Sequence, residues 1–248
     1  MTHSGQTGIT IDHDGVRLLG TLFLASGDDP KPTALILHGI PGIEKNYDLA
    51  HALRANGNNA LIFHYRGCWG SSGKYNVLTI LDDVAAAIRL LRSGSSPWVD
   101  PERLFLIGHS LGGWAAVLAS AADDRIRAAA VIAAVAKPSE FPLDNPDYAA
   151  DYTPWLTGIT PEALAKQWRA LGPDRTPVDQ VARIAPRPLL IIHSRTDEEV
   201  PVAHSRNLAE NAGAGSRYIE TEGGNHAFTW DRPWLQDLLL AWIRESGL

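Results

Sequence analysis

One serine stands between two glycines at a spacing that suits a nucleophile. Ser110 lies in the stretch IGHSLGGW, with Gly108 two positions before it and Gly112 two positions after it. An apolar run precedes the serine and a helix-like run follows it, so the serine falls on a sharp strand-to-helix turn. Such a turn brings the two flanking residues close together, and glycine avoids a Cβ clash there. The pattern predicts a serine hydroxyl placed to attack a carbonyl carbon.

A serine nucleophile needs a base and an acid, and later parts of the chain supply both. The base takes the hydroxyl proton, and the acid fixes the base's tautomer and balances its charge. Asp197 follows a buried run that ends at Ser194, and His226 lies in the glycine-rich stretch EGGNHAF. The sequence therefore predicts a triad of Ser110, Asp197 and His226. Glu198 is the next choice for the acid.

Other reactive side chains fit structural roles better. His38, His109 and His193 end strand-like runs, where a buried histidine more often shapes a loop than transfers a proton. Cys68 lacks the Gly-x-Cys-x-Gly spacing and a helix start behind it, so we expect a packed thiol. His13 between two aspartates fits an exposed hairpin turn, and nothing else indicates a metal site. The predicted chemistry needs no metal and no cofactor.

The rest of the chain alternates between strand-like and helix-like segments. Short apolar runs bounded by turn residues predict strands at 33–38, 59–65, 103–109, 128–135, 188–194 and 216–221. Residues 80–92 are the clearest helix, with Thr79 in position to cap it. Repeated strand and helix indicate a mostly parallel, doubly wound α/β sheet. Residues 9–11 and 16–25, joined at Asp14 and Gly15, add an antiparallel N-terminal edge.

Residues 137–186 break this alternation. The segment is rich in proline and aromatic residues and has no strand pattern, and so long a connection is usually a lid or a binding insertion. Thr160 followed by Pro161 predicts a helix start within it. Trp155 and Trp168 are candidates to face the substrate. We expect a single domain, residues 1–248, with 137–186 as a cap.

The composition excludes several classes of protein. With 248 residues, 45% of them hydrophobic, the chain has the size and character of one globular domain. The net charge is −6 and there is no basic block, so nothing favours nucleic acid as a partner. A single cysteine rules out an internal disulfide, and neither a signal peptide nor a membrane-spanning run is apparent. We expect a soluble cytoplasmic protein, and the oligomeric state stays open.

Five motifs, in chain order, resemble those of the α/β-hydrolase superfamily of serine hydrolases. They are HGIPG (38–42), YRGCWGSSG (65–73), GHSLGG (108–113), DEEVP (197–201) and GGNHAF (223–228). The chain is similar to small bacterial carboxylesterases, including cinnamoyl and feruloyl esterase-like members, and to the catalytic domains of prolyl-oligopeptidase-type peptidases. The resemblance implies the α/β-hydrolase fold, an acid at Asp197, and a cap at 137–186.

A site for the oxyanion completes the predicted machinery. Two backbone N–H groups usually hold the negative charge of the tetrahedral intermediate, and one belongs to the residue after the nucleophile, here Leu111. The other comes from the loop at 38–42, where Pro41 has no N–H, so Gly39 or Ile40 must donate. The resemblance favours Ile40.

Together these residues predict a serine esterase that acts on a small-molecule ester. We expect ester rather than amide hydrolysis, because a chain of 248 residues lacks the large extra domain with which prolyl-oligopeptidase-type enzymes select peptides. Peptidase, amidase or thioesterase activity on the same triad is an alternative. A ligand-binding or receptor-like member of the fold without catalysis is another, although all three triad positions are filled.

Overall fold

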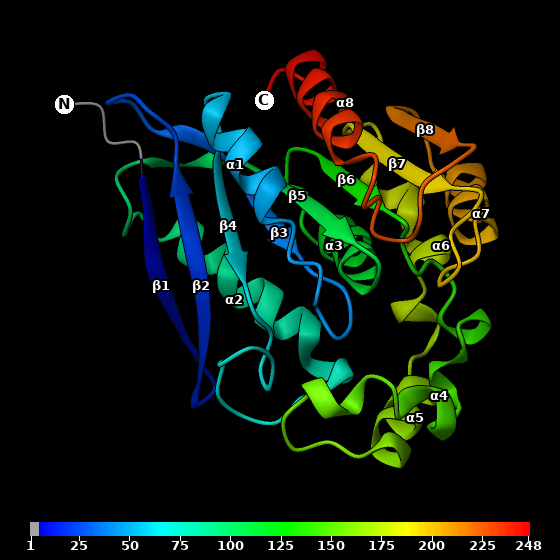
Figure 1. Ribbon diagram of the computed structural model, residues 1–248. Helices are drawn as coiled ribbons and strands as arrows, with labels where there is room; N and C mark the ends of the chain where they lie inside the picture. The colour runs from blue at the N-terminus through cyan, green and yellow to red at the C-terminus, as the bar shows by residue number, and fades with distance from the viewer. Residues whose placement is uncertain (1–4) are drawn as a thin grey trace.

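An eight-stranded sheet crosses the protein, as a computed structural model that describes residues 5–248 shows (Figure 1). The strand order is β1-β2-β4-β3-β5-β6-β7-β8. The pairs β1–β2 and β2–β4 are antiparallel and the other pairs are parallel, which confirms the predicted mixed sheet. The strands are β1 (Gly5–His13), β2 (Val16–Leu24), β3 (Lys31–Leu37), β4 (Asn59–Phe63), β5 (Val99–His109), β6 (Ala129–Ile132), β7 (Leu189–Ser194) and β8 (Ser216–Thr221).

Helices cover both faces of the sheet (Figure 1). On one face lie α1 (Tyr47–Ala55) and α8 (Arg232–Glu245). On the other lie α2 (Ile80–Arg92), α3 (Leu111–Ala122) and α7 (Ala203–Asn211). None of the helices that residues 5–248 form is both long enough and apolar enough to cross a membrane.

The parallel strands are apolar on both of their faces. In β3, Leu35 and Leu37 belong to the core beneath α2 and α3, whereas Ala34 and Ile36 belong to the core beneath α1 and α8. Successive residues of a strand point to opposite faces, so a strand covered on both sides needs an uninterrupted apolar run. This requirement explains why these strands can be recognised in the sequence.

The helix predicted at 80–92 is present as α2, but its start differs from the prediction. Thr79 makes no capping hydrogen bond to α2. A 3₁₀ turn, η1 (Val77–Thr79), precedes the helix, and the side-chain oxygen of Asn76 accepts the backbone N–H of Leu78 at 3.0 Å. The capping residue is therefore Asn76, because the chain begins to turn three residues before α2.

Short helices rather than strands follow β6. Each has a proline within its first two positions, where the missing N–H costs no hydrogen bond. The helix predicted at Pro161 is confirmed, with the Thr160 hydroxyl accepting the N–H of Ala163 at 3.3 Å. The elements are η2 (Pro138–Glu140), η3 (Pro142–Asp144), α4 (Pro146–Ala149), η4 (Thr153–Trp155), α5 (Pro161–Arg169) and η5 (Pro173–Arg175).

The last part of the predicted insertion lies against the core instead. Both α6 (Pro177–Gln180) and η6 (Val181–Ile184) contact α3. Val181 and Ile184 are buried in the same cluster as α3. These two elements complete the helical layer on that face of the sheet. We give the name cap to residues 137–176, the part of the predicted insertion 137–186 that precedes α6.

Candidate active site

Ser110 occupies the sharp turn between β5 and α3. Its backbone angles, φ 57° and ψ −120°, are unfavourable for a residue with a side chain. Hydrogen bonds hold the turn in place: the Ser110 N–H donates to the carbonyl of Ile132 on β6 at 2.9 Å, and the Ser110 carbonyl accepts the N–H of Gly113 at 2.9 Å. The neighbouring strand and the following helix thus impose the strained conformation.

The two flanking glycines are required by backbone contacts. A Cβ atom on Gly108 would lie 2.2 Å from the carbonyl oxygen of Gly112, so the predicted close approach of the two is confirmed. A Cβ atom on Gly112 would lie 2.0 Å from the carbonyl oxygen of Leu37 in β3. Gly112 therefore also allows α3 to begin directly against the next strand.

Asp197 and His226 meet beyond the ends of β7 and β8. The Nδ1 of His226 lies 2.8 Å from the Oδ2 of Asp197. The other oxygen, Oδ1, accepts the backbone N–H groups of Glu199 and Val200, both at 2.9 Å, and the carboxylate has no exposed surface. A nitrogen that faces a carboxylate carries the hydrogen, so the Nε2 of the neutral ring keeps the lone pair that a general base needs.

The surroundings of Asp197 keep it ionised. Burial by itself raises the pKa of this carboxyl, but hydrogen bonds from His193 and His226 outweigh that effect and hold its pKa well below the usual range. A charged carboxylate beside Nδ1 stabilises the imidazolium that forms when His226 takes a proton.

A second imidazole binds the same carboxylate. His193 ends β7 and is fully buried, with its Nε2 3.0 Å from the Oδ2 of Asp197 and 2.8 Å from the carbonyl oxygen of Val200. Because both neighbours are acceptors, Nε2 must carry the hydrogen. The Ser205 hydroxyl lies 2.7 Å from Nδ1. The sequence predicted only a structural role for His193, and its place four residues before Asp197 was the one signal of this contact.

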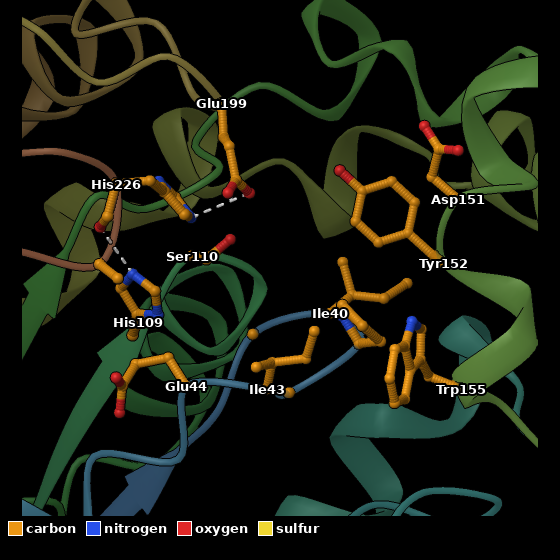
Figure 2. Close-up of a pocket in the computed structure, with 14 residues that line it drawn as sticks. Ile40, Ile43, Glu44, His109, Ser110, Asp151, Tyr152, Trp155, Glu199 and His226 are labelled. Atoms are coloured by element: carbon orange, nitrogen blue, oxygen red, sulfur yellow. Dashed lines mark hydrogen bonds and ion pairs between the residues drawn. The ribbon is translucent and has the colours of Figure 1, made fainter. Parts of the chain in front are cut away.

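Ser110 and His226 line one cavity of about 340 Å³. The Ser110 hydroxyl points into this cavity (Figure 2). Asp151, Tyr152 and Trp155 of the cap line it as well. The three side chains of the predicted triad, Ser110, Asp197 and His226, thus lie at one edge of the sheet. Asp197 lies behind His226 and does not line the cavity.

The predicted oxyanion donors lie at the same place. Leu111 is the first residue of α3, so its N–H has no carbonyl acceptor one turn earlier in the helix. Ile40 lines the cavity. A Cβ atom on Gly39 would lie 3.3 Å from the Ser110 hydroxyl oxygen, which shows how closely this backbone approaches the serine. An oxyanion formed at Ser110 would lie between these two segments.

The two cap tryptophans differ in position. Trp155 is 51% exposed, lines the cavity and stacks on Trp69. Trp168 is 2% exposed, packs against Phe141 and donates its indole N–H to the carbonyl of Pro138 at 2.8 Å. Trp168 therefore belongs to the interior of the cap, which corrects the prediction that it faces the substrate. The apolar stripe of its helix packs within the cap.

The remaining histidines near the site hold loops, as predicted. His38 Nδ1 bonds the carbonyl of Gly39 at 2.7 Å, and His109 Nε2 bonds the carbonyl of His226 at 3.0 Å. Burial lowers the pKa of His38 and of His109 to about 3, so both rings are neutral. Burial also raises the pKa of the Cys68 thiol far above its usual range. Within residues 5–248, no three His, Cys, Asp or Glu side chains gather as ligands for a metal ion.

Sequence comparison places these residues in a known family. The prolyl oligopeptidase family matches residues 47–245, a range that includes Ser110, Asp197 and His226. The uncharacterized protein Rv2307c of Mycobacterium tuberculosis (strain ATCC 25618 / H37Rv) is 31% identical over 225 residues. That match covers 90% of this chain and 73% of the relative.

Solved structures of similar fold include Est1E and an esterase domain. Est1E from Butyrivibrio proteoclasticus, solved with ferulic acid bound, has a TM-score of 0.77 at 20% identity and covers 96% of this chain and 98% of its own. The esterase domain of a Rhodothermus marinus protein has a TM-score of 0.73 at 23% identity. That match covers 97% of this chain and 98% of the esterase domain. With the sheet order and the family match, they establish the architecture: this chain belongs to the prolyl oligopeptidase family and is a serine hydrolase of the α/β-hydrolase fold.

Proposed function

We propose that the protein hydrolyses carboxylic esters through an acyl-enzyme, with Ser110 as nucleophile, His226 as general base and Asp197 as the group that orients it. One observation carries this proposal. The Ser110 hydroxyl points into a cavity whose wall also holds an imidazole fixed at Nδ1 by a fully buried carboxylate (Figure 2). That arrangement supports proton removal from a serine during attack on an acyl group.

The reaction follows two displacements. The Ser110 oxygen attacks the ester carbonyl carbon while His226 Nε2 takes its proton, and the N–H groups of Leu111 and Ile40 hold the oxyanion. Collapse of the intermediate breaks the bond to the alcohol oxygen, which takes the proton from His226. Water then attacks the acyl-enzyme, gives a proton to His226, and releases the acid as Ser110 regains its hydrogen.

Substrate binding is expected to tighten the contact between serine and histidine. The Ser110 hydroxyl and His226 Nε2 are not hydrogen-bonded to each other in this structure. His226 Nε2 lies instead 3.8 Å from a carboxylate oxygen of Glu199. Catalytic hydrogen bonds are often long in free enzymes and close to about 2.6–3.2 Å in the complex. A bound acyl group in the cavity would hold the Ser110 hydroxyl toward that nitrogen.

Two observations support a small ester as substrate. The cavity, at about 340 Å³, lies near the small end of the range for small-molecule sites. Proteins of the same architecture over nearly the full chain include an esterase domain and Est1E with ferulic acid bound. Ferulic acid is a carboxylic acid, the type of product that ester hydrolysis releases.

Steady-state kinetics test the proposal. The substrates are p-nitrophenyl acetate, butyrate and octanoate, methyl ferulate and alanine p-nitroanilide, each with the native protein and with Ser110→Ala. We expect turnover of at least one ester, little or none of the anilide, and a loss of at least about 10³-fold in the variant. Faster cleavage of the anilide, or ester turnover that survives in Ser110→Ala, would contradict the proposal.

A further inference from the structure

The wall of the active-site cavity is acidic. Glu44, Asp151 and Glu199 all line it, and no lysine or arginine of the described chain does so. The Lys45 ammonium lies 3.5 Å over the ring of Trp69, and Lys45 is not part of the lining. His109 is neutral at physiological pH because burial lowers its pKa to about 3. A ligand in this cavity therefore meets negative charge.

Glu199 stands on the side of the leaving group. Its carboxylate oxygen lies 3.8 Å from His226 Nε2, and its side chain is about half exposed. In Figure 2 this carboxylate points toward the imidazole of His226. In the proposed reaction Nε2 gives its proton to the departing alcohol oxygen, so the alcohol part of the ester must lie at this nitrogen. Glu199 is consequently a neighbour of the alcohol and not of the acyl chain.

Aromatic rings of the cap line the same cavity. Tyr152 and Trp155 come from the segment around η4, and the Tyr152 hydroxyl donates to that of Tyr148 at 2.9 Å. Burial raises the pKa of Tyr152, its hydrogen bond with Tyr148 raises it further, and so do the charges of Glu199 and Asp151. Both carboxylates and this ring belong to the wall of the same cavity. The face of an aromatic ring attracts a cation, and a nearby carboxylate adds to that attraction.

The cavity is built to receive a ligand, independently of its charge. The Ser110 hydroxyl belongs to a residue that is only 6% exposed, and it points into the cavity (Figure 2). The hydroxyl is therefore reached only through the cavity, and a substrate that reacts with it must lie against the acidic and aromatic wall.

We infer that the preferred substrates are esters of amino alcohols, whose ammonium group lies between Glu199 and the aromatic rings of Tyr152 and Trp155. This inference rests on the proposed ester hydrolysis. An anionic alcohol part would lie beside the Glu199 carboxylate and be repelled, and a neutral one would leave the charge of Glu199 unused. The carboxylate product carries negative charge too, so the same wall favours its release after deacylation.

A matched pair of substrates tests the inference. Acetylthiocholine and 3,3-dimethylbutyl thioacetate have the same shape and the same acyl group, and differ in a quaternary nitrogen against a quaternary carbon. Thiol release gives kcat/KM for each. We expect the cationic ester to be favoured about tenfold at low ionic strength. The advantage should shrink as salt is added, because half-exposed charges are screened.

Substitutions of two neighbouring glutamates distinguish binding of the ammonium group at Glu199 from long-range electrostatic attraction by the protein. Glu199→Gln removes the carboxylate from the cavity, and we expect the cationic advantage to fall to about twofold. Glu198→Gln removes the same charge from an exposed residue that does not line the cavity, and should leave the ratio as in the native protein. The ratio of two substrates cancels any general loss of activity in a variant.

Failure of this inference differs from failure of the proposed function. Equal kcat/KM values for the two thioesters would overturn the inference while ester hydrolysis stands. The inference would also be overturned if the ratio of the two kcat/KM values fell equally in both glutamate variants. The preference for the cation would then arise from long-range attraction. If the native, folded protein cleaved neither the thioesters nor the p-nitrophenyl esters, the proposed function itself would fail.

Discussion

The carboxyl edge of the sheet and the cap border the same cavity but are held by different kinds of contact. At the edge, backbone groups fix the reactive residues: Ser110 bonds Ile132 on the next strand, and Asp197 accepts two amide hydrogens of its own loop. In the cap, backbone hydrogen bonds of Thr157 with Gly67 and Tyr75, both at 2.8 Å, join the segment to a neighbouring loop, and side-chain contacts fill its interior, as when the Trp168 indole donates to Pro138. We therefore expect the sheet edge to fix the reaction geometry and the cap to shape the wall of the cavity.

This difference predicts how each region responds to substitution. Changes at the edge should abolish activity or stability, because backbone hydrogen bonds hold the reactive residues in a single conformation. Changes in the cap should alter which substrate is preferred and leave the reaction intact.

The largest effect is expected at the acid of the edge. Asp197→Asn replaces an acceptor that serves two imidazoles, so His226 loses its fixed tautomer and the charge that stabilises its protonated form. We expect kcat for p-nitrophenyl esters to fall by about 10⁴-fold. Circular dichroism checks that the variant is folded, and a loss below tenfold would show that another group serves as the acid.

A pair of glycine substitutions compares the stability of the two regions. Gly112→Ala puts a Cβ 2.0 Å from the Leu37 carbonyl oxygen, and neither backbone can retreat, so we expect a loss of about 3 kcal/mol or more. Gly158→Ala in the cap, at φ +72°, places its Cβ 2.7 Å from a flexible Lys74 side chain and should cost about 1 kcal/mol. Urea unfolding measures both. Equal losses would remove the distinction between edge and cap.

Substitution of His193 tests the second partner of Asp197. His193→Phe removes a hydrogen bond to a buried carboxylate, and we expect kcat to fall by about 10- to 100-fold with little change in KM. His193→Gln retains a donor and should recover part of the loss. A parallel rise in KM, or no recovery with glutamine, would point to general disruption of the loop.

Acid should destabilise the protein through the sheet region, which contains all the described histidines, because the cap contains none. Burial lowers the pKa of His38 and His109 to about 3, and of His64 and His204 to about 4. In the unfolded chain they titrate near about 6.5. Between these values the unfolded state binds more protons, so the free energy of unfolding is highest above about pH 7 and falls as the pH drops toward 4.

Thermal unfolding between pH 4.5 and 7.5 measures this dependence, and His204→Asn is its control. His204 Nδ1 accepts the backbone N–H groups of Ala136 and Lys137 at 3.1 and 3.2 Å. Its lone pair is therefore occupied, and protonation of this nitrogen would break both hydrogen bonds. Asparagine can accept a hydrogen bond there without titrating, and should make the fall in melting temperature shallower. A protein that grows more stable as the pH drops would contradict this assignment.

The smallest effect is expected in the cap wall. Trp155 is half exposed and stacked on Trp69, so Trp155→Ala should leave the melting temperature nearly unchanged. We expect kcat/KM to fall about fivefold for esters with an aromatic or cationic alcohol and much less for methyl esters. A uniform loss for all esters would mean that the cap supports the reaction as well as the choice of substrate.

The edge of the sheet could be predicted from the sequence because its geometry depends on few choices. Gly108 and Gly112 flank Ser110 at a spacing that the backbone itself requires. Apolar runs mark strands covered on both faces, and the carboxyl ends of parallel strands collect at one edge. The residues that follow those ends, Asp197 and His226, could therefore be placed together without coordinates.

Contacts made by particular side chains could not be predicted in this way. The apolar stripe of α5 contains Trp168, and periodicity says only that the stripe is covered, not that the cap covers it with Phe141. The contact between His193 and Asp197 depends on how one short loop folds back. Glu199 enters the cavity for the same reason, although Glu198 beside it does not.

Covalent labelling of Ser110 tests the central claim most directly. Folded protein is treated with a fluorophosphonate probe, and the adduct is located by mass spectrometry of the intact chain and of its peptides. We expect a single adduct on Ser110, absent from Ser110→Ala and strongly slowed in His226→Ala. A folded native protein that takes up no probe, or a Ser110→Ala variant that is labelled as readily, would contradict the account.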